Sequence, residues 1–220
     1  MKKVSAKPVE FGYSCSPTII AGVIYLPVGA PNSTMVAIKA ADGSVLWQSG
    51  TEPISHVGAY PISRNGRPMI VGYLKNTLEL YDRRTGQLLA TFPLTAGYDE
   101  HSAWPIYREP ILWISAPFRA GSQWFEITDD DPPLIVSRSQ TELMSNDVCS
   151  SVLVDNNLFG FDLRDAQTKM HRPSRGQFRC LDFVSGKERW SNGPSSGIRR
   201  AETNTENQSS SNVIGHASVL

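Results

Sequence analysis

Apolar residues recur along the chain in short runs, separated by clusters of Gly, Pro, Asn and Asp. No window shows the three- and four-residue apolar spacing of an amphipathic helix. The runs rich in β-branched and aromatic residues, which favour strands, are TIIAGVIYLPVG (18–29), RPMIVGYLKNTLELYD (67–82), PILWISAP (110–117), SVLVDNNLFGFD (151–162) and FRCLDF (178–183). The residues that could form tight turns inside or beside these runs are Ala21-Gly22, Arg64-Asn65-Gly66 and Asp155-Asn156-Asn157. Because Asn, Asp and Gly tolerate the positive φ of hairpin turns, the pattern predicts an all-β meander.

The meander contains a repeat. An eleven-residue pattern with Gly at its seventh position occurs as AIKAADGSVLW (37–47), LYDRRTGQLLA (80–90) and CLDFVSGKERW (180–190). A step of 43 residues separates the first two of these glycines, and an equal step leads to Asp129 in the acidic turn DDDPP (129–133). A second marker recurs at steps of 44, 44 and 46 residues, as CSPTI (15–19), AYPIS (59–63), AWPIY (103–107) and CSSVL (149–153). A period of about 40–45 residues with several strands per unit is typical of a β-propeller.

We therefore expect one propeller domain covering residues 1–220, with about four four-stranded blades and the first strand of a fifth. The expected blade starts are residues 13, 57, 101, 147 and 214. Two polar stretches, 163–176 and 194–212, are interpreted as insertions between strands.

The eleven-residue pattern resembles A-x-D-x-x-x-G-x-x-x-W, the tryptophan-docking repeat of pyrroloquinoline-quinone-type (PQQ-like) β-propellers in the quinoprotein alcohol dehydrogenase-like superfamily. The resemblance covers roughly residues 10–193 and looks closest to bacterial, planctomycete-type PQQ-like repeat proteins. The matching residues are Ala37, Gly43, Trp47, Asp82, Gly86, Asp182, Gly186 and Trp190, whereas Ala90 stands at the Trp position of the second copy. In such repeats the Trp is expected to pack between adjacent blades and the Gly to form the turn between the outer two strands.

The resemblance implies a ring of seven or eight blades, of which this chain would supply only part. An incomplete propeller could be a fragment, or a half-ring that a partner completes; a protein complete at this length is the competing interpretation. The family also implies a periplasmic or cell-envelope location, although MKKVSAKPVE (1–10) lacks the apolar core of a signal peptide.

The charge balance narrows the classes of partner. The chain has 21 Lys and Arg against 21 Asp and Glu, so it lacks the basic surplus that nucleic-acid binding requires. No run of about 18 apolar residues is present, which argues against a membrane span.

The residues leading into the first strand of each blade should line the central channel. The channel candidates for a cofactor or ligand are Tyr13, His56, His101, Trp104 and Asp147, with Asp99 and Glu100 as weaker metal ligands. Imidazoles and carboxylates can hold a divalent cation, but such segments are also polar simply because they are solvated. Trp104 could stack on a planar ligand or pack between blades.

The cysteines bear on the question of catalysis. Cys15, Cys149 and Cys180 form neither a C-x-x-C motif nor an adjacent pair, and we expect them to be small buried apolar residues. Quinoprotein dehydrogenases are similar in having an Asp base, calcium ligands and, in many, a disulfide between adjacent cysteines, which this sequence lacks. We expect no catalytic residue, bound metal or cofactor, and a binding or scaffolding module that contacts a protein or small ligand at its blade loops or channel mouth. A homodimer that closes the ring is a further expectation, and the alternative is a fragment of a PQQ- and calcium-dependent enzyme that oxidises an alcohol or sugar.

Overall fold

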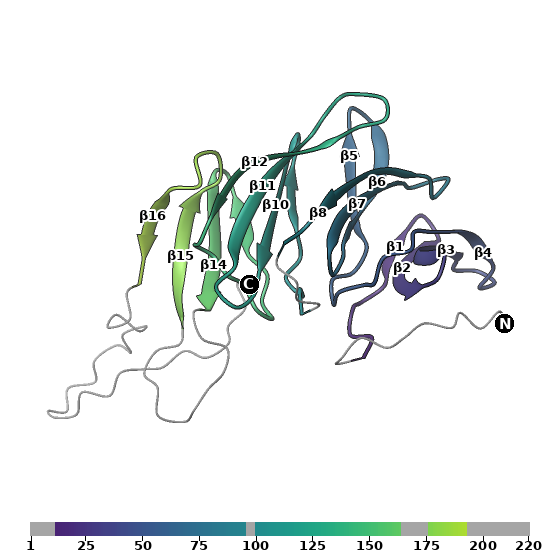
Figure 1. The fold of residues 1–220 in the computed structure, drawn as a ribbon, viewed down its shortest axis with the longest axis horizontal. Helices are drawn as coiled ribbons and strands as arrows, with labels where there is room; N and C mark the ends of the chain where they lie inside the picture. Colours follow the sequence, from purple (N-terminus) through teal and green to yellow (C-terminus); the bar gives the residue numbers. More distant parts are fainter. Residues whose placement is uncertain (1–11, 96–99, 164–175, 193–220) are drawn as a thin grey trace, which may run out of the picture. The chain divides into compact units, whose positions relative to one another are not determined.

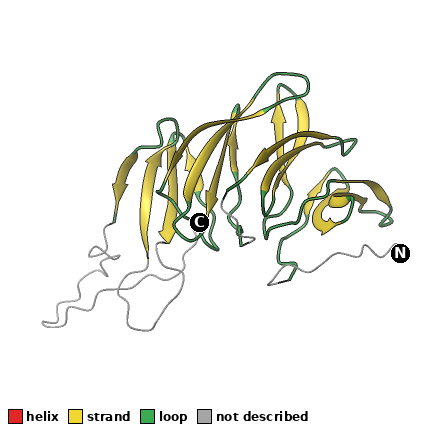
Figure 2. Cartoon of the chain, viewed as in Figure 1, coloured by secondary structure: helices red, strands yellow, loops and turns green. Residues whose placement is uncertain are grey.

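The computed structural model describes residues 12–95, 100–163 and 176–192. The described residues form strands, turns and loops without a helix, as Figure 2 shows. Within these ranges, accordingly, no helix has the length and apolar character needed to cross a bilayer. The strands form four four-stranded sheets, each with its strands in sequence order (Figure 1). The predicted all-β fold with four four-stranded units is confirmed.

Each sheet is built from one repeat of the sequence. The first consists of β1 (Thr18–Ile20), β2 (Val23–Ala30), β3 (Ser33–Lys39) and β4 (Val45–Ser49). The second consists of β5 (Tyr60–Arg64), β6 (Arg67–Tyr73), β7 (Thr77–Asp82) and β8 (Leu88–Pro93). The third consists of β9 (Ile106–Arg108), β10 (Ile111–Ala116), β11 (Gly121–Ile127) and β12 (Ile135–Thr141). The fourth consists of β13 (Val152–Val154), β14 (Asn157–Leu163), β15 (Gly176–Asp182) and β16 (Glu188–Ser191).

The first strands of the sheets begin a few residues after the predicted blade starts at 13, 57, 101 and 147, at Thr18, Tyr60, Ile106 and Val152. The expected fifth start at 214, the stretch 194–212 and residues 164–175 of the other expected insertion lie outside the described residues.

The chain divides into two compact units. The first unit comprises residues 1–114 and 124–138, and the second comprises residues 115–123 and 139–220. The dividing points fall within β10, β11 and β12.

In the first unit, strand alternation buries both faces of the second sheet. Ile70 and Tyr81 face a core shared with the first sheet, where Tyr25, Met35 and Ala37 lie. On the opposite face of the same strands, the residues of the second sheet pack with residues of the third, in a core that includes Met69, Val71, Leu80, Leu112, Ile114 and Phe125. Successive side chains of a strand point to opposite faces, so near-continuous apolar strands are what a sheet packed on both sides requires.

The second unit has a smaller core. Cys149, Phe161 and Leu163 are buried together, with Phe178 packed against them. Cys180 is also buried, and Cys15 is partly buried; all three cysteines are free thiols.

Candidate functional site

All three copies of the repeat fold into the same turn between the third and fourth strands of a sheet. In the second sheet the Gly86 N–H donates to the Asp82 carbonyl at 2.9 Å, and the Asp82 N–H donates to the Gln87 carbonyl at 2.8 Å. The turns at 39–44 and 182–187 make the corresponding two bonds. The seventh-position glycines have positive φ, at +71° for Gly43, +75° for Gly86 and +67° for Gly186. This conformation disfavours a Cβ, which explains the glycine at each turn.

An aspartate caps two of these turns. The Asp182 carboxylate accepts the N–H groups of Val184 at 3.1 Å and Ser185 at 2.8 Å, and it also pairs with Arg189. The hydrogen bond from the Ser185 backbone, followed by that from Arg189, holds the pKa of Asp182 well below its usual range. Asp82 makes the same two backbone contacts at 2.9 Å.

The contact between the first two sheets joins Trp47 to the turn of the next repeat. The indole Nε1 of Trp47 donates to the Arg83 carbonyl at 3.1 Å. A Cβ placed on Gly86 would lie 2.5 Å from Cδ2 and Cε3 of the same indole. Tyr25 packs on the ring, with centroids 5.9 Å apart and planes tilted by 46°. We call this contact the Trp–Gly seam; it needs both the large ring and the absence of a Cβ.

The next seam in the first unit is ionic. Its Trp position is Ala90 and its Gly position is Asp129. Instead of an indole contact, Arg64 pairs with Asp129 at 2.6 Å and with Glu109 at 2.8 Å. The Arg64 Nε also donates to the Ile127 carbonyl at 3.0 Å. We call this contact the ionic seam.

Neighbouring groups extend the ionic seam. The Asn65 N–H donates to Glu109 at 2.8 Å, and Arg67 pairs with Asp131 at 2.8 Å. The hydrogen bond from the Asn65 backbone, with that from Arg64, lowers the pKa of Glu109. Two carboxylates of the acidic turn 129–133 therefore pair with arginines of the preceding sheet.

Segments leading into the first strands, at 12–17, 53–59 and 100–105, contain most of the predicted channel residues; we call them the lead-in segments. His56 Nδ1 lies 2.7 Å from the Ser14 Oγ, and the His56 N–H donates to the His101 carbonyl at 2.9 Å. The His101 side chain is fully buried and stacks on Tyr73 with centroids 4.4 Å apart. Its Nδ1 is 3.0 Å from the Tyr73 hydroxyl. The structure thus places His56 and His101 on adjacent segments, with His101 inside the protein.

The same segments expose two aromatic side chains, Tyr13 at 50% and Trp104 at 36%. Trp104 packs edge-on against Tyr60, with ring centroids 5.7 Å apart. A Cβ on Gly58 would lie 2.8 Å from the Ser16 carbonyl oxygen and 3.4 Å from Cζ2 of Trp104, so all three lead-in segments approach one another at this glycine.

Two further predicted residues are placed less informatively. Glu100 is partly buried beside His101, and Asp99 lies outside the described residues. Asp147 is partly buried in the second unit.

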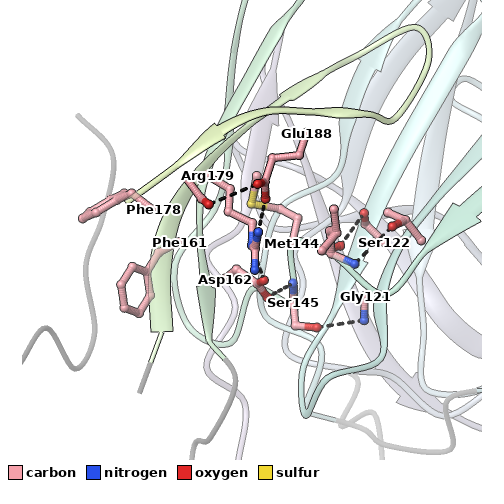
Figure 3. Close-up of polar contacts among 12 residues, drawn as sticks. Gly121, Ser122, Met144, Ser145, Phe161, Asp162, Phe178, Arg179 and Glu188 are labelled. Carbon is pink, nitrogen blue, oxygen red and sulfur yellow. Dashed lines mark hydrogen bonds and ion pairs between the residues drawn. The ribbon is translucent and has the colours of Figure 1, made fainter. Parts of the chain in front are cut away.

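A buried ion pair lies in the second unit (Figure 3). The Arg179 Nε donates to the Asp162 carboxylate at 2.6 Å, and their side chains are 8% and 0% exposed. Asp162 also accepts the Ser145 N–H at 2.9 Å, and Arg179 also pairs with Glu188. Sequence reasoning missed this network, although opposite charges inside the apolar runs of two paired strands were a signal for it.

The network fixes the segment that precedes the fourth sheet. As Figure 3 shows, the Gly121 N–H donates to the Ser145 Oγ at 2.8 Å, and the Ser122 hydroxyl donates to the Leu143 carbonyl at 2.9 Å. Met144, between them, is fully buried at a φ of +63°. Because a non-glycine residue rarely adopts this conformation without support from its surroundings, these contacts hold the segment rigidly.

The donor chemistry was compared with what calcium and PQQ would need. Among residues 12–95, 100–163 and 176–192, no three His, Cys, Asp or Glu side chains are grouped as metal ligands. The described residues therefore do not supply the oxygen-rich ligand set that calcium prefers.

Consecutive four-stranded meanders, each docked on the next through the same turn, define the blades of a β-propeller. The quinohaemoprotein alcohol dehydrogenase of Comamonas testosteroni is similar, with a TM-score of 0.58 and 13% identity over 82% of this chain. The Cps50 (Swd1) β-propeller domain of Myceliophteria thermophila is also similar, with a TM-score of 0.50 and 10% identity over 78% of this chain. The chain spans 34% of the length of the first structure and 57% of the second. These likenesses show the propeller fold. No protein-family model matches the sequence, and no curated protein matches it.

Proposed function

We propose that the chain is a non-catalytic binding or scaffolding β-propeller of the bacterial cell envelope, in the quinoprotein alcohol dehydrogenase-like superfamily of PQQ-like repeat proteins. The propeller likeness and the tryptophan-docking repeat support the superfamily, and the repeat resemblance supports the location. The role itself rests on the lead-in segments.

The observation that carries the binding role is the pair of exposed aromatic side chains, Tyr13 and Trp104, on segments with fixed backbones. Aromatic rings are enriched at the energetic centres of interfaces because they bury a large area at low entropic cost. The histidines beside them bond within the protein: His56 contacts Ser14, and His101 stacks on Tyr73. This arrangement suits a rigid recognition surface better than proton transfer to a substrate.

The binding role can be tested with a double variant, Tyr13→Ser with Trp104→Ser, in the full chain. Proteins captured from the cell-envelope fraction of the source organism should be lost with this variant. They should be retained with Leu134→Ser, which removes a side chain that is also 50% exposed but lies on the β11–β12 loop. Equal retention by both variants would contradict the assignment of the lead-in surface.

The enzymatic alternative, oxidation of an alcohol or sugar, is favoured by the fold of the Comamonas dehydrogenase. It can be tested by titrating the full chain with PQQ and calcium while following tryptophan fluorescence and dye-linked ethanol oxidation. We expect neither saturable quenching nor turnover. Calcium-dependent binding together with oxidation would replace the scaffolding proposal.

A further inference from the structure

Trp190 occupies in the fourth blade the place that Trp47 occupies in the first. Tyr25, Ala37 and Trp47 are register partners across the first sheet. The corresponding partners in the fourth sheet are Phe159, Cys180 and Trp190. The ring centroids of Phe159 and Trp190 are 6.2 Å apart at a tilt of 47°, close to the 5.9 Å and 46° of the Tyr25–Trp47 pair. The fourth blade thus presents the same docking face as the first.

The environments of the two indoles differ. Trp47 is partly buried against the turn at Gly86, whereas Trp190 is 50% exposed. No later copy of the repeat follows Trp190 in the sequence, so the chain contains no further glycine turn of this kind for its indole.

The first blade presents the matching receptor. Gly43 has the same turn geometry as Gly86, yet a Cβ on Gly43 would meet no described atom within 4 Å. Beside it, Ile24 and Ile38 are register partners and are partly exposed. Their counterparts in the second blade are Ile70 and Tyr81, which are fully buried by the Trp–Gly seam.

The adjacent strand β1 extends this receiving face. Ile19, the register partner of Ile24, is 62% exposed. The first blade therefore carries a glycine turn and an apolar face without an indole, and the fourth carries an indole without a glycine turn.

We infer that the chain associates head-to-tail with a second copy of itself, in which Trp190 of one copy docks on Gly43 of the other. By analogy with the bond from Trp47 to Arg83, the Trp190 Nε1 donates to the Ala40 carbonyl of the partner copy. Because the two faces differ, the contact is heterologous and repeats until rotation closes the assembly. Two copies joined at both seams hold eight four-stranded sheets, within the four to eight blades at which propellers close. The inference rests on the seam geometry and is independent of the ligand-binding role proposed above.

The first test is the mass in solution by size-exclusion chromatography with light scattering. We expect about 48 kDa, twice the 24.2 kDa of the chain. Trp190→Ala should raise the dissociation constant by at least about 30-fold, as loss of an interface hot spot does. Because Trp190 is half exposed, this variant should keep a cooperative melt.

The second test separates the two faces. Gly43→Asn should also give a monomer, because Asn tolerates positive φ while its side chain fills the receiving site. An equimolar mixture of Gly43→Asn and Trp190→Ala should form a one-to-one dimer, since each retains the face that the other has lost. Monomers in the mixture, or a monomeric unaltered chain, would overturn the inference.

The third test identifies what lies against position 190. With benzoylphenylalanine at this position, irradiation should cross-link to the peptide containing residues 40–43 of a second copy. A cross-link to residues 193–220 of the same chain would show that the chain covers its own indole, and would reject head-to-tail docking.

Discussion

Arg64 and Asp129 form an ion pair at 2.6 Å at the turn where a strict repeat would dock an indole on a glycine. The preceding repeat has Ala90 at its Trp position, so both halves of the Trp–Gly seam are missing together and a polar contact takes their place. One propeller therefore joins adjacent blades by two different kinds of contact, apolar at Trp47 and ionic at Arg64.

The ionic seam should make stability depend on salt. Arg64→Met should lower the melting temperature at about 0.05 M NaCl, and the loss should shrink near 1 M, where charges are screened within about 3 Å. Arg67→Met is the matched control, because Arg67 is more exposed and its partner Asp131 is 88% exposed. A deficit for Arg64→Met that does not change with salt would indicate that the arginine acts mainly through packing.

The Trp–Gly seam should be intolerant of a single methyl group. Gly86→Ala combines positive φ with a Cβ 2.5 Å from the Trp47 ring, and should cost about 2–4 kcal/mol of the free energy of unfolding. Gly22→Ala has a similar φ, +77°, with no described atom within 4 Å, and should cost only about 1 kcal/mol. Urea unfolding of both variants measures the difference; equal losses would mean that Trp47 moves aside freely.

The buried pair of the second unit should couple strongly. Asp162→Asn should destabilise the protein by about 2–4 kcal/mol, since it leaves the Arg179 charge buried with only Glu188 to balance it. Adding Arg179→Met should recover part of that loss. Glu188→Gln, at a site 33% exposed, should cost less than about 1 kcal/mol. A double-mutant cycle measures the coupling, and additive losses would contradict it.

The two histidines of the lead-in segments should differ in their contribution to stability. His101→Ala should cost about 2–4 kcal/mol, because it removes a fully buried ring stacked on Tyr73. His56→Ala, whose side chain contacts the exposed Ser14, should cost less than about 1 kcal/mol. Thermal melts compare them, and similar small losses would place His101 at a solvated surface instead.

A buried carboxyl should give an opposite pH dependence from the turn aspartates. Desolvation raises the pKa of Glu79 above its ordinary 4.5, with the charge of Glu52 adding to the shift, while the hydrogen bond from Tyr81 opposes it. The folded state therefore holds the Glu79 proton more tightly, and this stabilising contribution is complete below about pH 4.5 and lost as pH rises through the folded pKa.

Glu79→Gln should remove that loss. Its melting temperature relative to the unaltered chain should rise between about pH 4 and pH 8. By contrast, Asp182, whose pKa is lowered, stabilises above its ordinary pKa and loses this contribution as pH falls through the folded value. A constant difference between Glu79→Gln and the unaltered chain would show that Glu79 keeps an ordinary pKa.

Sequence reasoning found the strands and their grouping because both depend on neighbours in the chain. The turn at Ala21-Gly22 and the one at Asn65-Gly66 could be predicted, and all four residues have positive φ. It could not find the side-chain environment of His101, whose contact with Tyr73 depends on packing between successive sheets.

The sequence by itself determined the period, the four sheets and the turn at each repeat, because a positive φ and a capping aspartate act within a few residues. Only the tertiary structure decided that Arg64 joins Asp129, 65 residues further on, that Asp162 and Arg179 are buried together, and that His101 lies inside. These contacts depend on how completed strands and sheets approach one another, and on which polar groups burial then forces to pair. A repeat pattern carries no record of that approach.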